Sequence, residues 1–331
     1  MMKHLHIRLF LLCAILGCCF LLSSCEKNDG PVYITIENTN GNNRPGNGDN
    51  DGNSNITNEV TNIEIPKLDS ETGDVYAHYV TYKGQKVLNF VVDWHKDKLH
   101  SRWVAFTFTS TTSGQSWNRN NWDNTEWGGD PFQPDPLIPA EERTDQYSYK
   151  GSGYHRGHLL ASADRLFSKE GNEQTFYMSN MSPQHDRFNS DDWSDLENQV
   201  RNWGRNSSFR DTLFVVKGGT IRDDQIIKYI DNASYDADEG QNDEGQKIAV
   251  PKYYFMALLC KKHNGKQNTY KAIGFWVEHK SYGGRPVLSN WAVSIDELEA
   301  KTGIDFFCNL PDGLENSVER IFNISEWTGL K

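Results

Sequence analysis

Runs of β-branched and aromatic residues predict a set of strands between residues 87 and 278. Such side chains suit the pleated, half-buried surface of a sheet, and Gly, Asn or Asp stands near most ends of these runs. The expected strands are Val87–Asp93, Trp103–Thr109, Leu213–Lys217, Tyr253–Lys261 and Tyr270–Glu278.

Two helices are predicted from their end residues. Ser294 with a Glu three positions later forms a capping box, and Gly303 stands where a left-handed residue ends a helix of about two turns. Ser190 or Asp191 is the expected cap of a second helix, from about Asp192 to Trp203. Because strands and helices do not alternate regularly, the pattern predicts an α+β fold with a central antiparallel sheet flanked by helices.

The first residues form a targeting segment rather than part of that fold. Lys3 and Arg8 precede an apolar run from Leu9 to Leu22, which is short for a bilayer span but typical of a secretory signal peptide. Leu-Ser-Ser-Cys25 at its end resembles a bacterial lipobox, and a plain signal peptide with an incidental cysteine is the alternative. We therefore expect residues 1–24 to be a lipoprotein signal peptide and Cys25 to carry lipid. That places the chain in the bacterial cell envelope, at a periplasmic or surface face of the outer membrane, with the lipid as its membrane contact.

A tether follows the lipid site. Between Asn38 and Asn55, 14 of 18 residues are Asn, Gly or Asp, a composition that cannot bury a core. We therefore assign residues 25–61 to a flexible tether and residues 62–331 to the folded domain.

Composition and charge narrow the class of protein. With 37% hydrophobic and 24% charged residues, the chain is neither a multi-span membrane protein nor wholly disordered. The net charge of −11 argues against a nucleic-acid coat protein, although it permits a small basic cleft. Once the signal peptide is removed and Cys25 is lipidated, Cys260 and Cys308 remain, which allows at most one disulfide.

Residues with catalytic chemistry concentrate between Arg119 and Glu197. Asn189, Trp193 and Glu197 are spaced by four and are expected along one helix face, where an amide and a carboxylate oxygen suit Mg²⁺. A neutral imidazole such as His158 can deprotonate water beside such an ion, and arginines can hold phosphoryl charge. These residue types together indicate a phosphodiester hydrolase.

Simpler interpretations of the same residues remain open at this point. The His155–His158 pair can be a surface cluster, and an Asn before a helix is usually a cap. The tryptophans at 117, 122 and 127 can stack on bases or pack in the core. Zinc-protease, phosphate-loop and serine-hydrolase motifs do not occur in the sequence.

The order of these motifs resembles the DNA/RNA non-specific endonuclease family, the sugar-non-specific ββα-metal nucleases. The resemblance covers roughly Tyr76 to Val318. The motifs that carry it are Arg-Gly-His158, Ser-Asn180-Met-Ser-Pro-Gln184, Phe-Asn189, Trp193 and Leu-Glu197.

The resemblance implies roles for these residues. His158 matches the general base, Asn189 the direct protein ligand of Mg²⁺, and Glu197 a residue that holds metal-bound waters; Mn²⁺ or another divalent ion is also compatible. Arg119 and Arg156 match residues that neutralise charge on the phosphoryl group. Asn180 matches a polar site member that orients its neighbours. The implied reaction cuts DNA and RNA and leaves 5′-phosphates.

Three departures from the family pattern bear on these assignments. His155 replaces the usual Asp before Arg-Gly-His, Met256 stands where a lysine is common, and one extra residue follows Arg119 before the tryptophan. Two alternative functions are considered. The chain can be a catalytically weak family member that binds nucleic acid, or a surface lipoprotein that binds glycans. A homodimer is left open.

Overall fold

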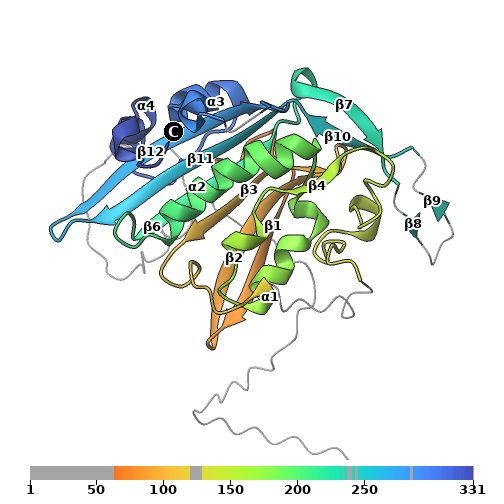
Figure 1. Ribbon diagram of the computed structural model, residues 1–331, viewed down its shortest axis with the longest axis horizontal. Helices are drawn as coiled ribbons and strands as arrows, with labels where there is room; N and C mark the ends of the chain where they lie inside the picture. Colours follow the sequence, from red (N-terminus) through yellow and green to blue (C-terminus); the bar gives the residue numbers. More distant parts are fainter. Residues whose placement is uncertain are drawn as a thin grey trace, which may run out of the picture. The chain divides into compact units, whose positions relative to one another are not determined.

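The five predicted strands lie together in one antiparallel sheet (Figure 1). The computed structural model describes residues 63–119, 129–233, 235–236, 241–242, 245–283 and 286–330. Within them the strand order is β1-β2-β3-β6-β11-β12-β13. The bounds are β1 Asp74–Tyr82, β2 Gln85–His95, β3 His100–Phe108, β6 Thr212–Gly219, β11 Tyr253–His263, β12 Asn268–Glu278 and β13 Ala292–Val293.

In the described part of the chain, three pairs of short strands lie outside this sheet, and all are antiparallel. They are β4 (His155–His158) with β5 (Met181–Gln184), β7 (Ile226–Asp231) with β10 (Lys247–Pro251), and β8 (Tyr235–Asp236) with β9 (Gln241–Asn242). The first pair carries the Arg-Gly-His motif.

Helices and short helical turns connect the strands. The helices are α1 Lys169–Glu173, α2 Ser194–Arg205, α3 Ile295–Thr302 and α4 Asp312–Arg320, and a π-helical turn, η6 Phe188–Trp193, precedes α2. The 3₁₀ turns are η2 Ala140–Glu142, η3 Ser162–Asp164, η4 Gln174–Phe176, η5 Met178–Asn180, η7 Asp223–Gln225, η8 Leu288–Trp291 and η9 Ile324–Glu326.

Alternation along the strands gives the sheet two apolar faces, each with its own buried cluster. In β6, Leu213 and Val215 point to one face and Phe214 and Val216 to the other. The first face is covered by α2 and the second by α3 and α4 (Figure 1). Coverage on both sides explains why the central strands are hydrophobic throughout and do not alternate with polar residues.

The two predicted helix starts had different outcomes. The Ser294 hydroxyl accepts a hydrogen bond from the Glu297 amide at 3.1 Å, and Gly303 has φ of +71°, so both ends of α3 are confirmed. The expected cap of α2 at Ser190 or Asp191 is wrong. Both residues lie inside the π-helical turn, and α2 begins without a side-chain cap.

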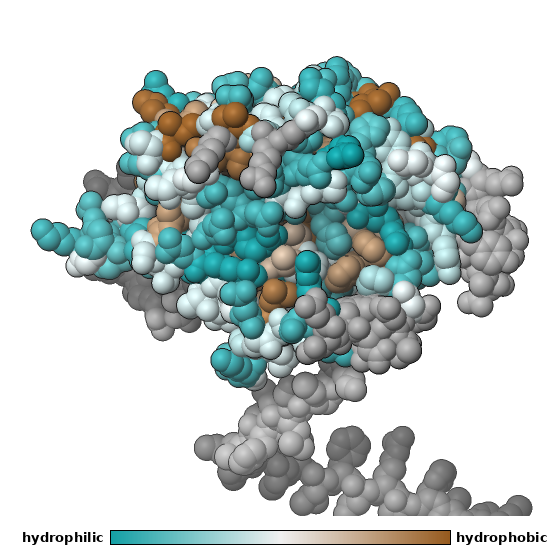
Figure 2. Space-filling model, viewed as in Figure 1, coloured by the Kyte–Doolittle hydropathy of each residue, from teal (hydrophilic) through white to brown (hydrophobic). Residues whose placement is uncertain are grey.

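The sheet with its helices confirms the α+β class. Cys260 and Cys308 are both free thiols, and among the described residues no helix is long and apolar enough to cross a bilayer. Hydrophilic side chains predominate on the face seen in Figure 2. The predicted signal peptide, Cys25 and the tether lie outside the described residues.

Candidate active site

The β4–β5 hairpin and α2 together form a ββα unit that carries the motif residues. In the hairpin, His158 lies opposite Met181, and Gly157 lies opposite Ser182. The indole Nε1 of Trp193 donates a hydrogen bond to the His158 carbonyl oxygen at 3.3 Å. This bond ties the end of β4 directly to the start of α2, so the hairpin and the helix are held as one unit.

The His158 ring is half-buried between aromatic rings. Its centroid lies 5.1 Å from that of Phe176 and 5.7 Å from that of Phe132. The ring nitrogen Nε2 is inaccessible to solvent and has no hydrogen-bond partner within the described residues. Burial, and then the positive charges of Arg119, Lys217 and Arg156, lower the pKa of His158 from 6.5 to about 3, against the opposing effect of Asp164. At neutral pH the imidazole is therefore uncharged and able to accept a proton.

Arg156 lies beside this ring, and a carboxylate from another segment holds it. Its Nη1 donates to Asp130 Oδ2 at 2.9 Å and to the Gln146 carbonyl oxygen at 3.0 Å. The guanidinium also lies 3.8 Å from the centre of the Phe132 ring. Asp130 thus supplies the support that His155 cannot give. His155 is exposed, and its Nδ1 lies 3.7 Å from Asp186 Oδ1.

Arg119 and Asn180 occupy different environments. Arg119 is exposed at the edge of the described segment, and its charge acts on His158. Asn180 is fully buried, with its Oδ1 accepting from the Leu160 amide at 2.8 Å. Its Nδ2 donates to the carbonyl oxygens of Leu160 and Thr175 at 2.9 and 2.7 Å. These bonds anchor the chain immediately after His158 and use both N–H donors of the carboxamide.

Asn189 is the residue whose chemistry fits a metal ligand. It lies in η6, half-buried, and its backbone amide donates to the His185 carbonyl oxygen at 2.8 Å. Its carboxamide oxygen is a hard ligand of the type that Mg²⁺ prefers. The π-helical turn is itself of a kind that often marks functional sites.

Glu197 lies in α2, the helix that follows the turn with Asn189, and belongs to a buried network of charges. Its Oε1 accepts a hydrogen bond from Lys217 Nζ at 3.1 Å. Lys217 also lies 3.7 Å from Asp164 Oδ2, whose other oxygen receives Arg201 Nε at 2.6 Å. Burial raises the pKa of Glu197, and the Lys217 charge opposes that rise. The lysine therefore favours the ionised carboxylate beneath the site.

Lys217 is the main site residue that the sequence interpretation missed. It is completely buried, in the strand next to β11, and the sheet register places it directly opposite Met256. The sheet register therefore places a buried cation directly opposite Met256, on the neighbouring strand.

A histidine and three tryptophans near the motif residues are not part of this site as described. His185 is exposed, with its ring 4.8 Å from Tyr154 and 4.5 Å from His279. Trp117 is half-buried in a loop. Trp122 and Trp127 lie outside the described residues.

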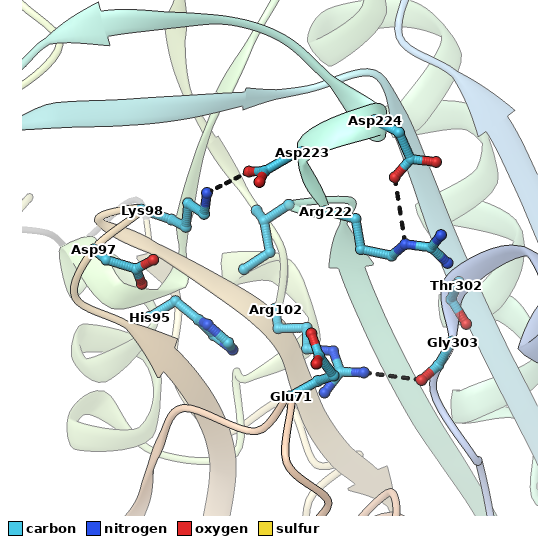
Figure 3. Close-up of a pocket in the computed structure, with 11 residues that line it drawn as sticks. Glu71, His95, Asp97, Lys98, Arg102, Arg222, Asp223, Asp224, Thr302 and Gly303 are labelled. Carbon is cyan, nitrogen blue, oxygen red and sulfur yellow. Dashed lines mark hydrogen bonds and ion pairs between the residues drawn. The ribbon is translucent and has the colours of Figure 1, made fainter.

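A large open pocket lies elsewhere and has different chemistry (Figure 3). Its volume is about 730 Å³, and none of the motif residues lines it. Its cations already have partners: Lys98 pairs with Asp223 at 2.6 Å, and Arg222 with Asp224 at 3.4 Å.

A histidine on a β-hairpin tied to a helix with Asn and Glu defines the class of ββα-metal nucleases. A family model for DNA/RNA non-specific endonucleases matches residues 72–313. The chain therefore belongs to this family of divalent-metal-dependent phosphodiester hydrolases.

Named relatives are nucleases from diverse organisms. A nuclease of Nostoc sp. is 29% identical over 247 residues, which cover 73% of this chain and 78% of the relative. Mitochondrial nuclease 1 of Schizosaccharomyces pombe is 28% identical over 55% of each chain. Mouse mitochondrial nuclease EXOG is 29% identical over 54% of this chain and 46% of its own length. The chain thus spans about half the length of the two mitochondrial relatives.

A solved structure has the same fold. A chain in the crystal structure of the EndoG/EndoGI complex matches with a TM-score of 0.55 and 19% identity, over 79% of this chain and 96% of that chain. At this identity the likeness concerns the fold alone, and it confirms the ββα-metal architecture.

Proposed function

We propose that this chain is a Mg²⁺-dependent endonuclease that cuts DNA and RNA with little sequence preference and leaves 5′-phosphates. The observation that carries the proposal is the neutral, cation-flanked ring of His158, tied through Trp193 to the element that bears Asn189. A surface histidine would have neither the lowered pKa nor that connection.

His158 acts as the general base. Its uncharged imidazole accepts a proton from the water that attacks the scissile phosphorus. Loss of such a base typically costs about 10²–10⁴ in rate. Arg156 and Arg119 place positive charge where the phosphoryl oxygens gain negative charge. Asp130 holds the Arg156 guanidinium against the Phe132 ring, so little reorientation is needed when substrate binds.

Asn189 is proposed as the direct protein ligand of the divalent ion, and Glu197 as the residue that orients its waters. When bound, such an ion stabilises charge on the leaving oxygen. A neutral carboxamide binds Mg²⁺ weakly and leaves it mostly hydrated. The charge of Glu197, maintained by Lys217, therefore contributes to holding those waters.

Broad specificity follows from what the proposed site contacts. Guanidinium groups and a hydrated ion recognise phosphates, which carry no sequence information. No contact in this proposal requires or excludes a 2′-hydroxyl, so both DNA and RNA are substrates.

The sequence supports a location in the cell envelope. The Leu-Ser-Ser-Cys25 lipobox and the Asn/Gly/Asp-rich tether are the basis for proposing a lipid-anchored enzyme. Its substrate would then be nucleic acid outside the cytoplasm.

The decisive experiment compares cleavage of supercoiled plasmid and of a long RNA by His158→Ala and by the matched control His155→Ala. His155 is exposed on the same strand, so its variant should retain wild-type activity. His158→Ala should lose at least about 10²-fold in rate with an unchanged melting temperature. A His158→Ala enzyme with more than half of wild-type activity would refute the role of the base.

The metal assignment is tested in the same assay. Asn189→Ala should abolish cleavage with poor rescue by high Mg²⁺, because no other direct ligand is available. Glu197→Gln should be milder, since it alters only water orientation. Full activity of Asn189→Ala, or wild-type cleavage in excess EDTA, would show that the metal site is misplaced.

A further inference from the structure

Three carboxylates meet on the side of the sheet away from the nuclease motif. Asp296 and Glu299 come from α3 and Glu319 from α4, the two helices that cover the second face (Figure 1). One oxygen of each lies within 4.8 Å of the others. Among the described residues, these three form the one group of three or more His, Cys, Asp or Glu side chains that is close enough to share an ion.

Glu319 distinguishes this cluster from an ordinary acidic surface. The residue is only 6% exposed, and its Oε1 is buried without a hydrogen-bond partner in the described part of the chain. A buried carboxylate oxygen with no partner is costly, because desolvation is not offset by any donor. One oxygen of this carboxyl group lies within 4.8 Å of an oxygen of each of the other two, so the buried side chain borders the space between them.

The surrounding charges are negative. Burial, and then the carboxylates of Glu299, Glu315, Asp305 and Asp296, raise the pKa of Glu319 to about 9. The two nearby lysines already pair elsewhere, Lys67 with Asp305 at 3.1 Å and Lys301 with Glu297 at 3.5 Å. A cation between the helices would satisfy the unpartnered oxygen and remove the repulsion together.

We propose that Asp296, Glu299 and Glu319 bind one Ca²⁺ ion that joins α3 to α4. Oxygen atoms around Ca²⁺ lie about 2.3–2.6 Å from the ion, so opposite ligands are roughly 5 Å apart. The three carboxylate oxygens lie within 4.8 Å of one another, so one ion can reach all of them. Glu299 keeps one oxygen free, because only its Oε1 accepts the Phe306 amide, at 2.7 Å. The exposed Asp296 leaves room for waters to complete the coordination.

This site is independent of the nuclease site and of its proposed function. The sheet lies between them, and the ligand sets differ, with three carboxylates here and one carboxamide at Asn189. The ion therefore contributes to stability and not to catalysis. Partial exposure and ligands from two short helices predict weak binding, with a Kd of about 10⁻⁴–10⁻³ M, as in extracellular calcium modules.

The test is thermal unfolding of the full chain in the Asn189→Ala background, which removes the proposed catalytic ligand. Calcium at ten times its Kd should raise the melting temperature by about 3 °C relative to EDTA. Calorimetric titration with CaCl₂ should give one site. An Asn189→Ala protein with neither a thermal shift nor calorimetric binding would overturn the proposal.

Glu319→Gln in that background assigns the effect to the cluster. This variant should lose the calcium shift, yet in EDTA it should unfold at about the same temperature as its parent, because a neutral amide replaces a buried carboxyl group whose ionisation is disfavoured. Asp296→Asn should weaken the shift, and Glu170→Gln, at an exposed carboxylate of α1, should retain it. A full calcium shift in Glu319→Gln would refute the assigned ligands. Cleavage by Glu319→Gln alone, in saturating Mg²⁺, should equal wild type.

Discussion

Lys217 shows how one buried charge can support two acids at once. It contacts Glu197 at 3.1 Å and Asp164 at 3.7 Å and is itself completely buried. A buried ion pair contributes little net stability, but removing one partner leaves the other uncompensated, at a cost of about 3–5 kcal/mol. Removing Lys217 should therefore destabilise the fold even if the intact ion pairs contribute little net stability.

Lys217→Met should lower both stability and cleavage, because Glu197 loses its counter-charge. The double variant Lys217→Met/Met256→Lys should recover much of both. In the double variant the lysine side chain leaves the backbone at position 256, which pairs with position 217 on the adjacent strand. The two side chains of such a pair lie on the same face, with their Cβ atoms on the order of 5 Å apart. Melting temperatures and plasmid cleavage rates of the two proteins measure this. No recovery in the double variant would mean that Lys217 cannot be replaced from that strand.

The pKa of His158 gives a second prediction at this scale. A histidine is a base only above its pKa, so a ring with a pKa of about 3 in the metal-free protein is neutral well below pH 6.5. The acid limb of kcat/KM should therefore lie below pH 6.5. Arg119→Met should raise the His158 pKa, since it removes a nearby positive charge.

NMR titration of ring-labelled, metal-free protein measures that pKa directly. Arg320→Met, at the end of α4, is the control and should leave it unchanged. A His158 that titrates at 6.5 or above would contradict the buried, cation-flanked environment.

Sequence motifs predicted the candidate site residues that lie close together in the chain. Arg156, His158, Asn189 and Glu197 all fall within residues 156–197, so their order is visible without a fold. Asp130 and Lys217 were missed because only folding brings them to the site. The sequence around Asp130 does not indicate that its carboxylate binds Arg156. Nor does the apolar strand around Lys217 indicate that its ammonium group binds Glu197.

Among the elements, β4 depends on a close approach to β5. A Cβ atom at Gly157 would lie 2.1 Å from Oε1 of Gln184, which is fully buried between the two strands. Glycine is required there by space and not by backbone conformation.

Gly157→Ala should therefore displace Gln184 and the adjacent His158, with a loss of stability of about 1–3 kcal/mol and a larger loss of cleavage. Gln184→Ala opens the space, so the double variant should lose less than the sum of the single changes. Chemical denaturation of all four proteins in this cycle measures the coupling. Strict additivity would exclude the clash as the cause.

The start of α2 shows why element boundaries were harder to predict than the elements. Ser190 and Asp191 are good cap residues, and local preference placed the helix start there. Phe188 and Trp193 are both buried, with their rings stacked at 5.8 Å, and this packing continues the helical backbone upstream as a π turn. Tertiary burial outweighed the local preference. The five strands were predicted correctly because both sheet faces are covered, which makes their sequences continuously apolar.

On the scale of the whole molecule, the residues predicted to attach the enzyme to the membrane are separate from those proposed for catalysis, and the predicted tether lies between them in the sequence. Membrane attachment is predicted to depend on Cys25 alone and catalysis on residues 119–217. Cys25→Ser should therefore release an active nuclease from the membrane fraction, whereas the signal-peptide variant Cys18→Ser should remain attached. Fractionation followed by a cleavage assay measures both. A Cys25→Ser protein that stays in the membrane fraction would exclude lipidation at this residue.

The contact between Glu197 and Lys217 has a consequence for the cell that makes the enzyme. During synthesis, the proposed base, metal ligand and acid emerge together in one short stretch, before β6 has been made. Until β6 joins the sheet, Glu197 lacks the Lys217 counter-charge and the site is incomplete. A nuclease built this way is harmless to its producer's own nucleic acids while unfolded, and it becomes active only when folding is finished.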